Sequence, residues 1–348
     1  MIENVSEKDA STLSLEDSIR EASNKGPGTR EIVADVAIKS AQHALADRGV
    51  ATAIRNGDLN ALWRASRVPF LPEFLAGTKY DPAPLKEQYP VLIRARLIHG
   101  NRDAEVAVVD SRGSERAKSV MSYRPNSVPK GRIWSAEANG FYFGNRYSLV
   151  SADHHFEILF PIDESPNILI SQAKIDLSVL DVPEEFAARA DQVIWDDATV
   201  TNSDIDSNLV AIVSKGTASN RAAWRIVVGI AHKPSRELAN AFAPKDGNVT
   251  KDMAATLLNS FITLVPAVQL DSSNNLQSTE LLAASRGMSG SPVFVFLERL
   301  GKYVFAGTTW GGGALQDFNT GNVRVSIVFH GIEEFRRALA ETLPRQLR

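Results

Sequence analysis

Residues Arg286–Phe294 read RGMSGSPVF, a turn of small residues followed by the start of an apolar strand. A nucleophilic serine needs an exposed turn and nearby backbone N–H groups that stabilise an oxyanion. Gly287 can adopt backbone angles that present its N–H to the site, and Gly290 permits a tight approach after Ser289. Pro292 fixes the backbone where the turn enters the strand. This segment therefore predicts Ser289 as a nucleophile on an exposed turn.

A second segment, Gly140–His154, reads GFYFGNRYSLVSADH and lies upstream of the serine turn. Glycines flank one short strand, and a turn leads to a second strand that ends just before His154. Histidine is the most frequent general base in catalysis. A zinc site at His154 and His155 is disfavoured, because adjacent side chains point in different directions and the sequence has neither an HExxH motif nor a cysteine. The residues themselves leave both His154 and His155 open as the base of a site without metal or cofactor.

These segments resemble the trypsin-like serine peptidases. Ser151–His154 is similar to the family motif T-A-x-H, with serine for threonine, and Gly287–Pro292 is similar to G-x-S-G-[GS]-P. Phe305–Gly311, which reads FAGTTWG, resembles G-[IV]-x-S-W-G with Thr309 in the serine place. The resemblance covers roughly residues 130–340. It implies a mostly β protein with a chymotrypsin-like pair of six-stranded Greek-key barrels and the active site between them.

The resemblance also implies a reaction and a set of roles. The protein would be a serine endopeptidase, a hydrolase that works through an acyl-enzyme on a peptide or protein substrate. Ser289 would attack, His154 would carry the proton, and the N–H groups of Gly287 and Ser289 would form the oxyanion hole. The implied substrate-binding residues are Ala283, Thr309, Trp310 and Gly311.

Ala283 would lie at the base of the primary specificity pocket, six positions before the nucleophile in the family pattern. A buried cationic side chain of a substrate needs a paired anion. Ala283 supplies none, and its neighbours over 281–284 are uncharged as well. We therefore expect the enzyme to cleave after uncharged, apolar residues.

The acid that supports His154 is open between three residues. Such an acid holds the tautomer of the base and stabilises the imidazolium. Asp206 is favoured, because it lies at the expected distance from His154 and shortly before an apolar strand. Literal alignment places Asn208 in the acid position instead. Asp176 matches the family pattern D-[LIV]-A-[LIV]-[LIV] better, but it follows His154 closely.

Two other readings of the serine segment lead to different functions. An α/β-hydrolase elbow, G-x-S-x-G, would need glycine where Ser291 stands and an acid and a histidine after the serine. Asp317 and His330 follow in that order, but the stretch after Ser289 is short for the strands and helices of that fold. One alternative that stays open is an inactive peptidase-like module that binds peptides or proteins, which Asn208 in the acid position would favour. Another is an interaction protein whose function lies in residues 1–128.

The rest of the chain divides into a helical extension over 1–90 and a β-rich peptidase domain over 91–348. The spacing of apolar residues predicts helices over 29–48, ended by Gly49, and over 59–66. Five prolines then predict a non-helical connector, so the extension should stand apart from the barrels. Short apolar runs separated by turn residues predict β-strands. They span 91–99, 104–109, 141–144, 147–151, 156–160, 167–171, 209–213, 224–230, 261–269, 292–297, 303–308 and 323–329. A closing helix is expected from about Gly331.

The amino-acid composition indicates a soluble globular protein. The 348 residues are 44% hydrophobic and 23% charged, which is ordinary for globular domains. A net charge of −3 gives no reason to expect a nucleic acid or an anionic membrane as partner. The lack of cysteines favours a reducing compartment, and no apolar run suits a signal peptide or a membrane span. We therefore expect a soluble cytoplasmic protein.

Overall fold

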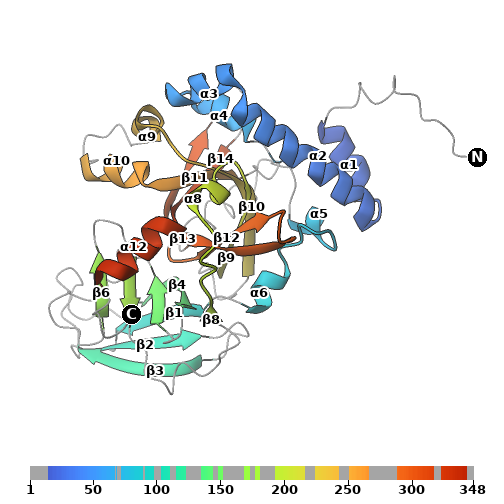
Figure 1. The fold of residues 1–348 in the computed structure, drawn as a ribbon. Coiled ribbons are helices and arrows are strands. Elements are labelled where there is room, and N and C mark those ends of the chain that lie inside the picture. Colours follow the sequence, from blue (N-terminus) through green and yellow to red (C-terminus); the bar gives the residue numbers. More distant parts are fainter. Residues whose placement is uncertain are drawn as a thin grey trace, which may run out of the picture.

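The computed structural model comprises a closed β-barrel, a second β-sheet and a layer of helices (Figure 1). The residues that the structure describes are 15–66, 68, 72–88, 91–97, 103–109, 115–122, 135–143, 148–151, 168–172, 177–180, 193–215, 224–242, 251–265, 288–316 and 323–342.

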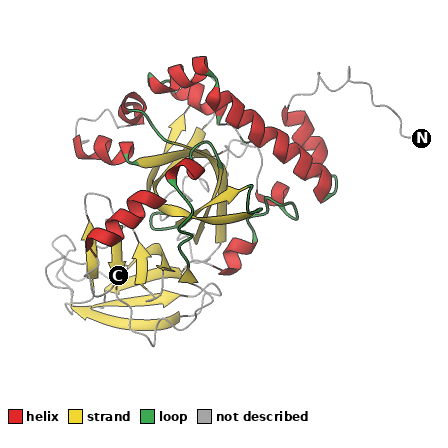
Figure 2. Ribbon diagram, viewed as in Figure 1, coloured by secondary structure: helices red, strands yellow, loops and turns green. Residues whose placement is uncertain are grey.

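Six antiparallel strands from the C-terminal part of the chain form the closed barrel (Figure 2). They are β9 (Leu209–Lys215), β10 (Trp224–His232), β11 (Ser260–Val265), β12 (Pro292–Leu297), β13 (Lys302–Gln316) and β14 (Val323–Gly331). The order around the barrel is β10-β11-β14-β13-β12-β9. Because β12 returns to pair beside β9, the first four strands form a Greek key, and the β13–β14 hairpin closes the circle. The predicted β-barrel is thus present in this half of the molecule.

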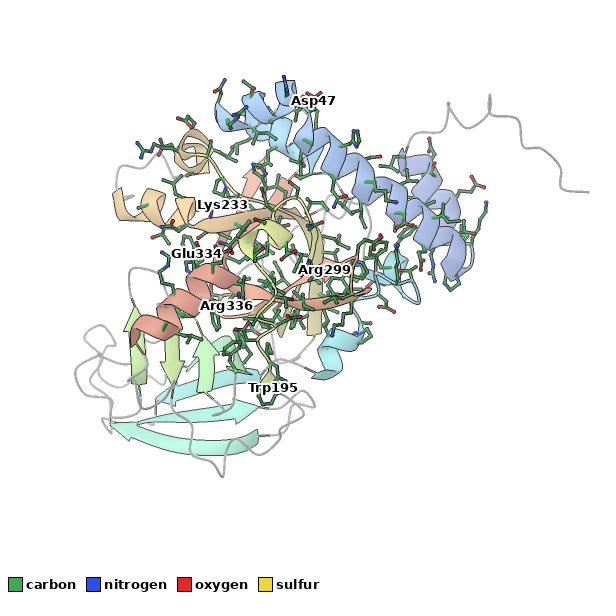
Figure 3. The ribbon with its side chains drawn as sticks, viewed as in Figure 1. Asp47, Trp195, Lys233, Arg299, Glu334 and Arg336 are labelled. Atoms are coloured by element: carbon green, nitrogen blue, oxygen red, sulfur yellow. The ribbon has the colours of Figure 1, made fainter. Side chains whose placement is uncertain are left out.

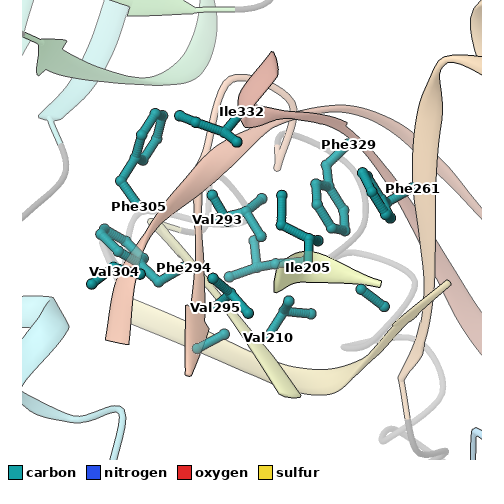
Figure 4. Close-up of a cluster of buried hydrophobic side chains, with 14 of the residues drawn as sticks. Ile205, Val210, Phe261, Val293, Phe294, Val295, Val304, Phe305, Phe329 and Ile332 are labelled. Atoms are coloured by element: carbon teal, nitrogen blue, oxygen red, sulfur yellow. The ribbon is translucent and has the colours of Figure 1, made fainter. Parts of the chain in front are cut away.

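Buried aromatic and β-branched side chains fill the barrel and its surroundings. Phe261 and Phe329 stack with their ring centroids 5.5 Å apart, close to Val293 and Ile205 (Figure 4). All six residues of β12 are buried, which explains why its sequence is an unbroken apolar run rather than an alternating one.

A second sheet contains the strands of the middle of the chain. They are β1 (Val91–Leu97), β2 (Asp103–Val109), β3 (Glu115–Ser122), β4 (Ser135–Phe143), β5 (Ser148–Ser151), β6 (Ile168–Gln172), β7 (Leu177–Leu180) and β8 (Val193–Ile194). Their order is β3-β2-β1-β4-β5-β7-β6, with β8 parallel to β4. Within the described residues this sheet ends at β3 and β6, so one closed barrel is present and a second is not seen.

The N-terminal helices pack directly on the barrel. They are α1 (Leu15–Ser23), α2 (Pro27–Ala46), α3 (Arg48–Arg55), α4 (Leu59–Ala65), α5 (Pro72–Leu75) and α6 (Pro84–Gln88). Ile38 and Leu75 share one hydrophobic core with Ile230, Phe296 and Val328 of the barrel strands. The helices cover one side of the barrel in Figure 1, and they do not stand apart from it as the connector prolines had suggested.

The proline-rich connector also contains helices where none was expected. Both α5 and α6 begin at a proline, Pro72 and Pro84. Proline is tolerated at the first helical position because its fixed φ suits the helix and its missing N–H would have had no partner there. These prolines therefore start short helices rather than exclude them.

Four more helices lie beside the barrel. They are α8 (Asn202–Ile205), α9 (Arg236–Phe242), α10 (Lys251–Leu258) and α12 (Ile332–Thr342). The expected closing helix is α12, and it buries Ile332 and Phe335 as its periodicity predicts. Figure 1 shows α12 between the barrel and the second sheet. No helix in the described part of the chain is long and apolar enough to cross a membrane.

Candidate functional site

Ser289 lies on a tight turn, Met288–Ser291, immediately before β12. The N–H of Ser291 donates to the carbonyl oxygen of Met288 at 3.0 Å, which closes the turn. Gly290 has φ +80°, the left-handed value that a type II turn requires at its third residue. Ser289 is the second residue of this turn and is half-buried, while Met288 and Ser291 are buried. Ser289 is therefore the one residue of this turn whose side chain is partly exposed to solvent.

Thr309 of β13 holds this turn in place. The N–H of Gly290 donates to the Thr309 carbonyl at 2.7 Å, and the Thr309 N–H donates to the Ser291 carbonyl at 2.9 Å. The Thr309 hydroxyl donates to the Met288 carbonyl at 2.5 Å and accepts the Ser291 N–H at 3.0 Å. The family resemblance implies a substrate-binding role for Thr309, and the structure shows that its hydroxyl fixes the serine turn. A buried hydroxyl with this many partners leaves the turn little freedom.

Trp310 and Gly311 follow Thr309 at an irregularity of β13. Ser289 Oγ donates to the Trp310 carbonyl at 3.3 Å. The Trp310 indole N–H donates to Ser260 Oγ at 3.0 Å, and its ring stacks on His330 with centroids 5.7 Å apart. The register between β13 and β14 shifts between Thr309 and Gly311. The indole is thus held by contacts on two strands, β11 and β14, while the main-chain carbonyl of Trp310 accepts the Ser289 hydroxyl.

Beyond Thr309, one edge of β13 has no partner strand among the described residues. β12 pairs with β13 only as far as Thr308, whereas β14 pairs with it as far as Gln316. Among the described strands, none pairs with the second edge of Trp310–Gln316. An extended peptide can add to such an edge through main-chain hydrogen bonds.

Four of the expected site residues, His154, Asp176, Ala283 and Gly287, lie outside the described residues. The described strands nearest to two of them pair with each other. β5 ends at Ser151, shortly before His154 in the sequence, and β7 begins directly after Asp176. Ser151 is the partner of Ser178 in this antiparallel pair.

Asp206 and Asn208 lie between α8 and β9, and both side chains have hydrogen-bond partners. Asp206 Oδ1 accepts the N–H of Lys233 at 2.9 Å and lies 3.7 Å from Nδ1 of His232. Burial lowers the pKa of His232, and the Asp206 charge opposes that shift. Asn208 Oδ1 accepts a hydrogen bond from Gln42 of α2 at 2.8 Å, so its amide joins the barrel to the helical layer.

The described residues contain no group of three or more histidine, aspartate or glutamate side chains that could hold a metal ion. No protein-family model matches the chain, and a search of curated proteins finds no significant relative.

Proposed function

We propose that this protein is a serine endopeptidase with Ser289 as nucleophile and His154 as general base. The observation that carries the proposal is the serine turn, which Thr309 binds to β13 beside an edge that no described strand covers. A nucleophile and a peptide-binding edge in one place are what cleavage of a polypeptide requires.

The proposed chemistry proceeds through an acyl-enzyme. Ser289 Oγ bonds to the scissile carbonyl carbon while its proton passes to the imidazole of His154. The proton then goes to the leaving nitrogen as the C–N bond breaks, which frees the amine. Water attacks the resulting ester with His154 again as base, and the carboxylic acid leaves as the Ser289 hydroxyl re-forms. The N–H groups of Gly287 and Ser289 hold the oxyanion in both steps.

Asp176 is the acid that the strand pairing supports best. The antiparallel pairing of β5 with β7 brings the end of the strand before His154 next to the start of the strand after Asp176. By contrast, the carboxylate of Asp206 already accepts the Lys233 N–H, and the side-chain oxygen of Asn208 accepts a hydrogen bond from Gln42. We therefore propose Asp176 in this role and keep Asp206 as the alternative to test.

A serine-directed phosphonate probe with an apolar side chain tests the proposal. We expect the wild-type protein to be labelled and Ser289→Ala to lose labelling and peptide cleavage, with kcat lower by about six orders of magnitude. Ser291→Ala is the matched control, because this serine is in the same turn but its hydroxyl is fully buried. It should keep both activities. A wild-type protein that binds peptides but resists the probe would indicate the inactive binding module instead.

The same assay separates the candidate acids. Replacing the acid of a serine peptidase triad by its amide lowers kcat by about four orders of magnitude. We expect that loss for Asp176→Asn and near wild-type turnover for Asp206→Asn. The reverse result would restore Asp206 as the acid.

Substrate specificity is proposed from the same motif. With Ala283 at its base, the primary pocket would gain roughly 25 cal/mol per Å² of apolar substrate surface and would leave a cation unpaired. Cleavage of a peptide library should therefore follow apolar residues. Dominant cleavage after Arg or Lys would contradict the assignment of Ala283.

A further inference from the structure

Arg336 of α12 binds the segment that connects the second sheet to the barrel. Its guanidinium donates to the Asp196 carboxylate, with Nη2 to Oδ1 at 2.6 Å and Nε to Oδ2 at 2.9 Å. Nη1 also donates to the Val200 carbonyl at 2.7 Å, and Nη2 to the Asp197 carbonyl at 2.6 Å. Figure 3 shows Arg336 on the helix between the two parts of the molecule. A planar fork that serves three residues at once fixes the path of the connecting segment.

The same helix holds the connecting segment at a second place. The N–H of Asn202 donates to Glu333 Oε1 at 2.9 Å, and its side-chain amide donates to Glu334 Oε2 at 2.8 Å. Glu334 is buried, so its carboxylate is fixed as well. The chain is thus bound to α12 on the barrel side as well as on the sheet side.

Apolar contacts join α12 to the sheet and to the barrel. The Phe335 ring lies 4.8 Å from that of Phe143 in β4 and 5.2 Å from that of Phe305 in β13, measured between centroids. Ile194 of β8 belongs to the same core. α12 therefore packs into the joint between the sheet and the barrel, and Arg336 secures the chain that crosses it.

We infer that Arg336 is a positioning residue, which sets the sheet relative to the barrel and so aligns the base with the nucleophile. This rests on the proposed function, in which His154 follows the sheet strand β5 while Ser289 and the β13 edge belong to the barrel. Substrate binding then needs the barrel alone, but proton transfer needs both parts in register. A misalignment of about 1 Å can reduce a rate about 100-fold.

The inference predicts a loss of kcat without a change in KM. For Arg336→Ala we expect kcat on a peptide ester, and the rate of phosphonate labelling, to fall about 100-fold while KM stays within about two-fold. Arg336→Lys keeps the charge but not the planar fork, so it should behave similarly. Arg337→Ala is the matched control, because this arginine is next in the helix and 59% exposed, and contacts Glu334 instead. It should keep wild-type kcat and KM.

Each outcome bears on a different claim. If Arg336→Ala does not fold, Asp196→Asn removes the same ion pair more gently and should lower kcat in the same direction. Wild-type kcat in the folded Arg336→Ala and Asp196→Asn proteins would overturn the positioning role, and so would a rise in KM that accounts for the whole loss of kcat/KM. A wild-type protein that the phosphonate does not label would overturn the proposed function itself.

Discussion

Thr308 and Thr309 are adjacent in β13, both are buried, and their hydroxyl groups differ completely in their contacts. The Thr309 hydroxyl bonds to both ends of the serine turn, whereas the structure gives that of Thr308 no hydrogen-bond partner among the described residues. A hydroxyl contributes to stability only if its bonds replace those it would make to water. The two threonines therefore form a natural comparison for the serine site.

We expect Thr309→Val to lower the free energy of unfolding by about 1–3 kcal/mol and to slow labelling of Ser289. The reason is that the turn loses its hydrogen bonds to the Thr309 hydroxyl. Thr308→Val should be neutral or slightly stabilising, since it removes a buried hydroxyl that has no partner among the described residues. Urea denaturation and the phosphonate labelling rate measure both effects. Equal losses in the two variants would show that packing, rather than the hydroxyl bonds, holds the turn.

His232 makes stability depend on pH. Burial lowers its pKa below the ordinary value of 6.5, so the unfolded chain takes up a proton at a higher pH than the folded protein does. The contribution of neutral His232 is therefore complete above about pH 6.5 and is lost as pH falls through the lower, folded value. We expect the stability difference between the wild type and His232→Gln to shrink between pH 7.5 and 5.5. A difference that grows would mean that attraction to Asp206 outweighs burial.

At the scale of elements, the glycine run of β13 extends a strand that the sequence predicts to end at residue 308. Instead, β13 continues through Gly311–Gly313 to Gln316 and pairs with β14 over this stretch. A Cβ on Gly312 would lie 2.5 Å from the Ser326 carbonyl oxygen, so the close approach of β14 requires glycine there. A Cβ on Gly311 would meet nothing within 4 Å.

Substitution of these two glycines should affect stability and peptide cleavage separately. Gly312→Ala should lower the free energy of unfolding by about 1–3 kcal/mol, because the added methyl group collides with the backbone of β14. Gly311→Ala should leave Tm unchanged or raise it, but lower kcat/KM for peptides if the substrate strand lies against this residue. Calorimetry and a peptide assay give the two readouts. Wild-type kcat/KM in the Gly311→Ala variant would contradict a place for this residue in the proposed substrate-binding edge.

Local signals predicted several elements and the turn at Ser289, although this turn is largely buried rather than exposed. The turn over Met288–Ser291 depends on Gly290 and the neighbouring small residues. Its conformation is therefore determined by residues that are adjacent in the sequence. The helix expected over 29–48 ends two residues early, because Asp47 accepts the N–H groups of Gly49 and Val50 and starts α3. Capping by a side chain outweighed the helical periodicity that runs through this point.

The features that the sequence left open depend on non-local pairing. The choice among Asp176, Asp206 and Asn208 depends on which strands lie side by side, and the pairing of β5 with β7 is set by tertiary context rather than by propensity. The packing of the N-terminal helices on the barrel is non-local as well. Their sequence shows an apolar face but not what covers it.

At the scale of the whole molecule, the helical layer and the barrel share one core. Deletion of residues 1–88 would expose the apolar residues that the helices cover, such as Ile230, Phe296 and Val328. It would also remove the ion pair of Lys79 with Glu298. We therefore expect the truncated protein to aggregate or to bind a hydrophobic dye, whereas deletion of 1–26, which removes α1 alone, should be tolerated better. A soluble, cooperatively unfolding 89–348 fragment would contradict this view.

The shared core also constrains how the protein is made. The helices end at Gln88, but the last strand of the barrel that they cover ends at Gly331. On a ribosome that adds 5–20 residues per second, the helices would wait roughly 12–50 s for their partner. Bonds such as Tyr303 to Tyr80, 223 residues apart, raise the contact order further. During that interval the apolar face of the nascent helices is uncovered, so folding in the cell should depend on chaperones more than the stability of the finished protein suggests.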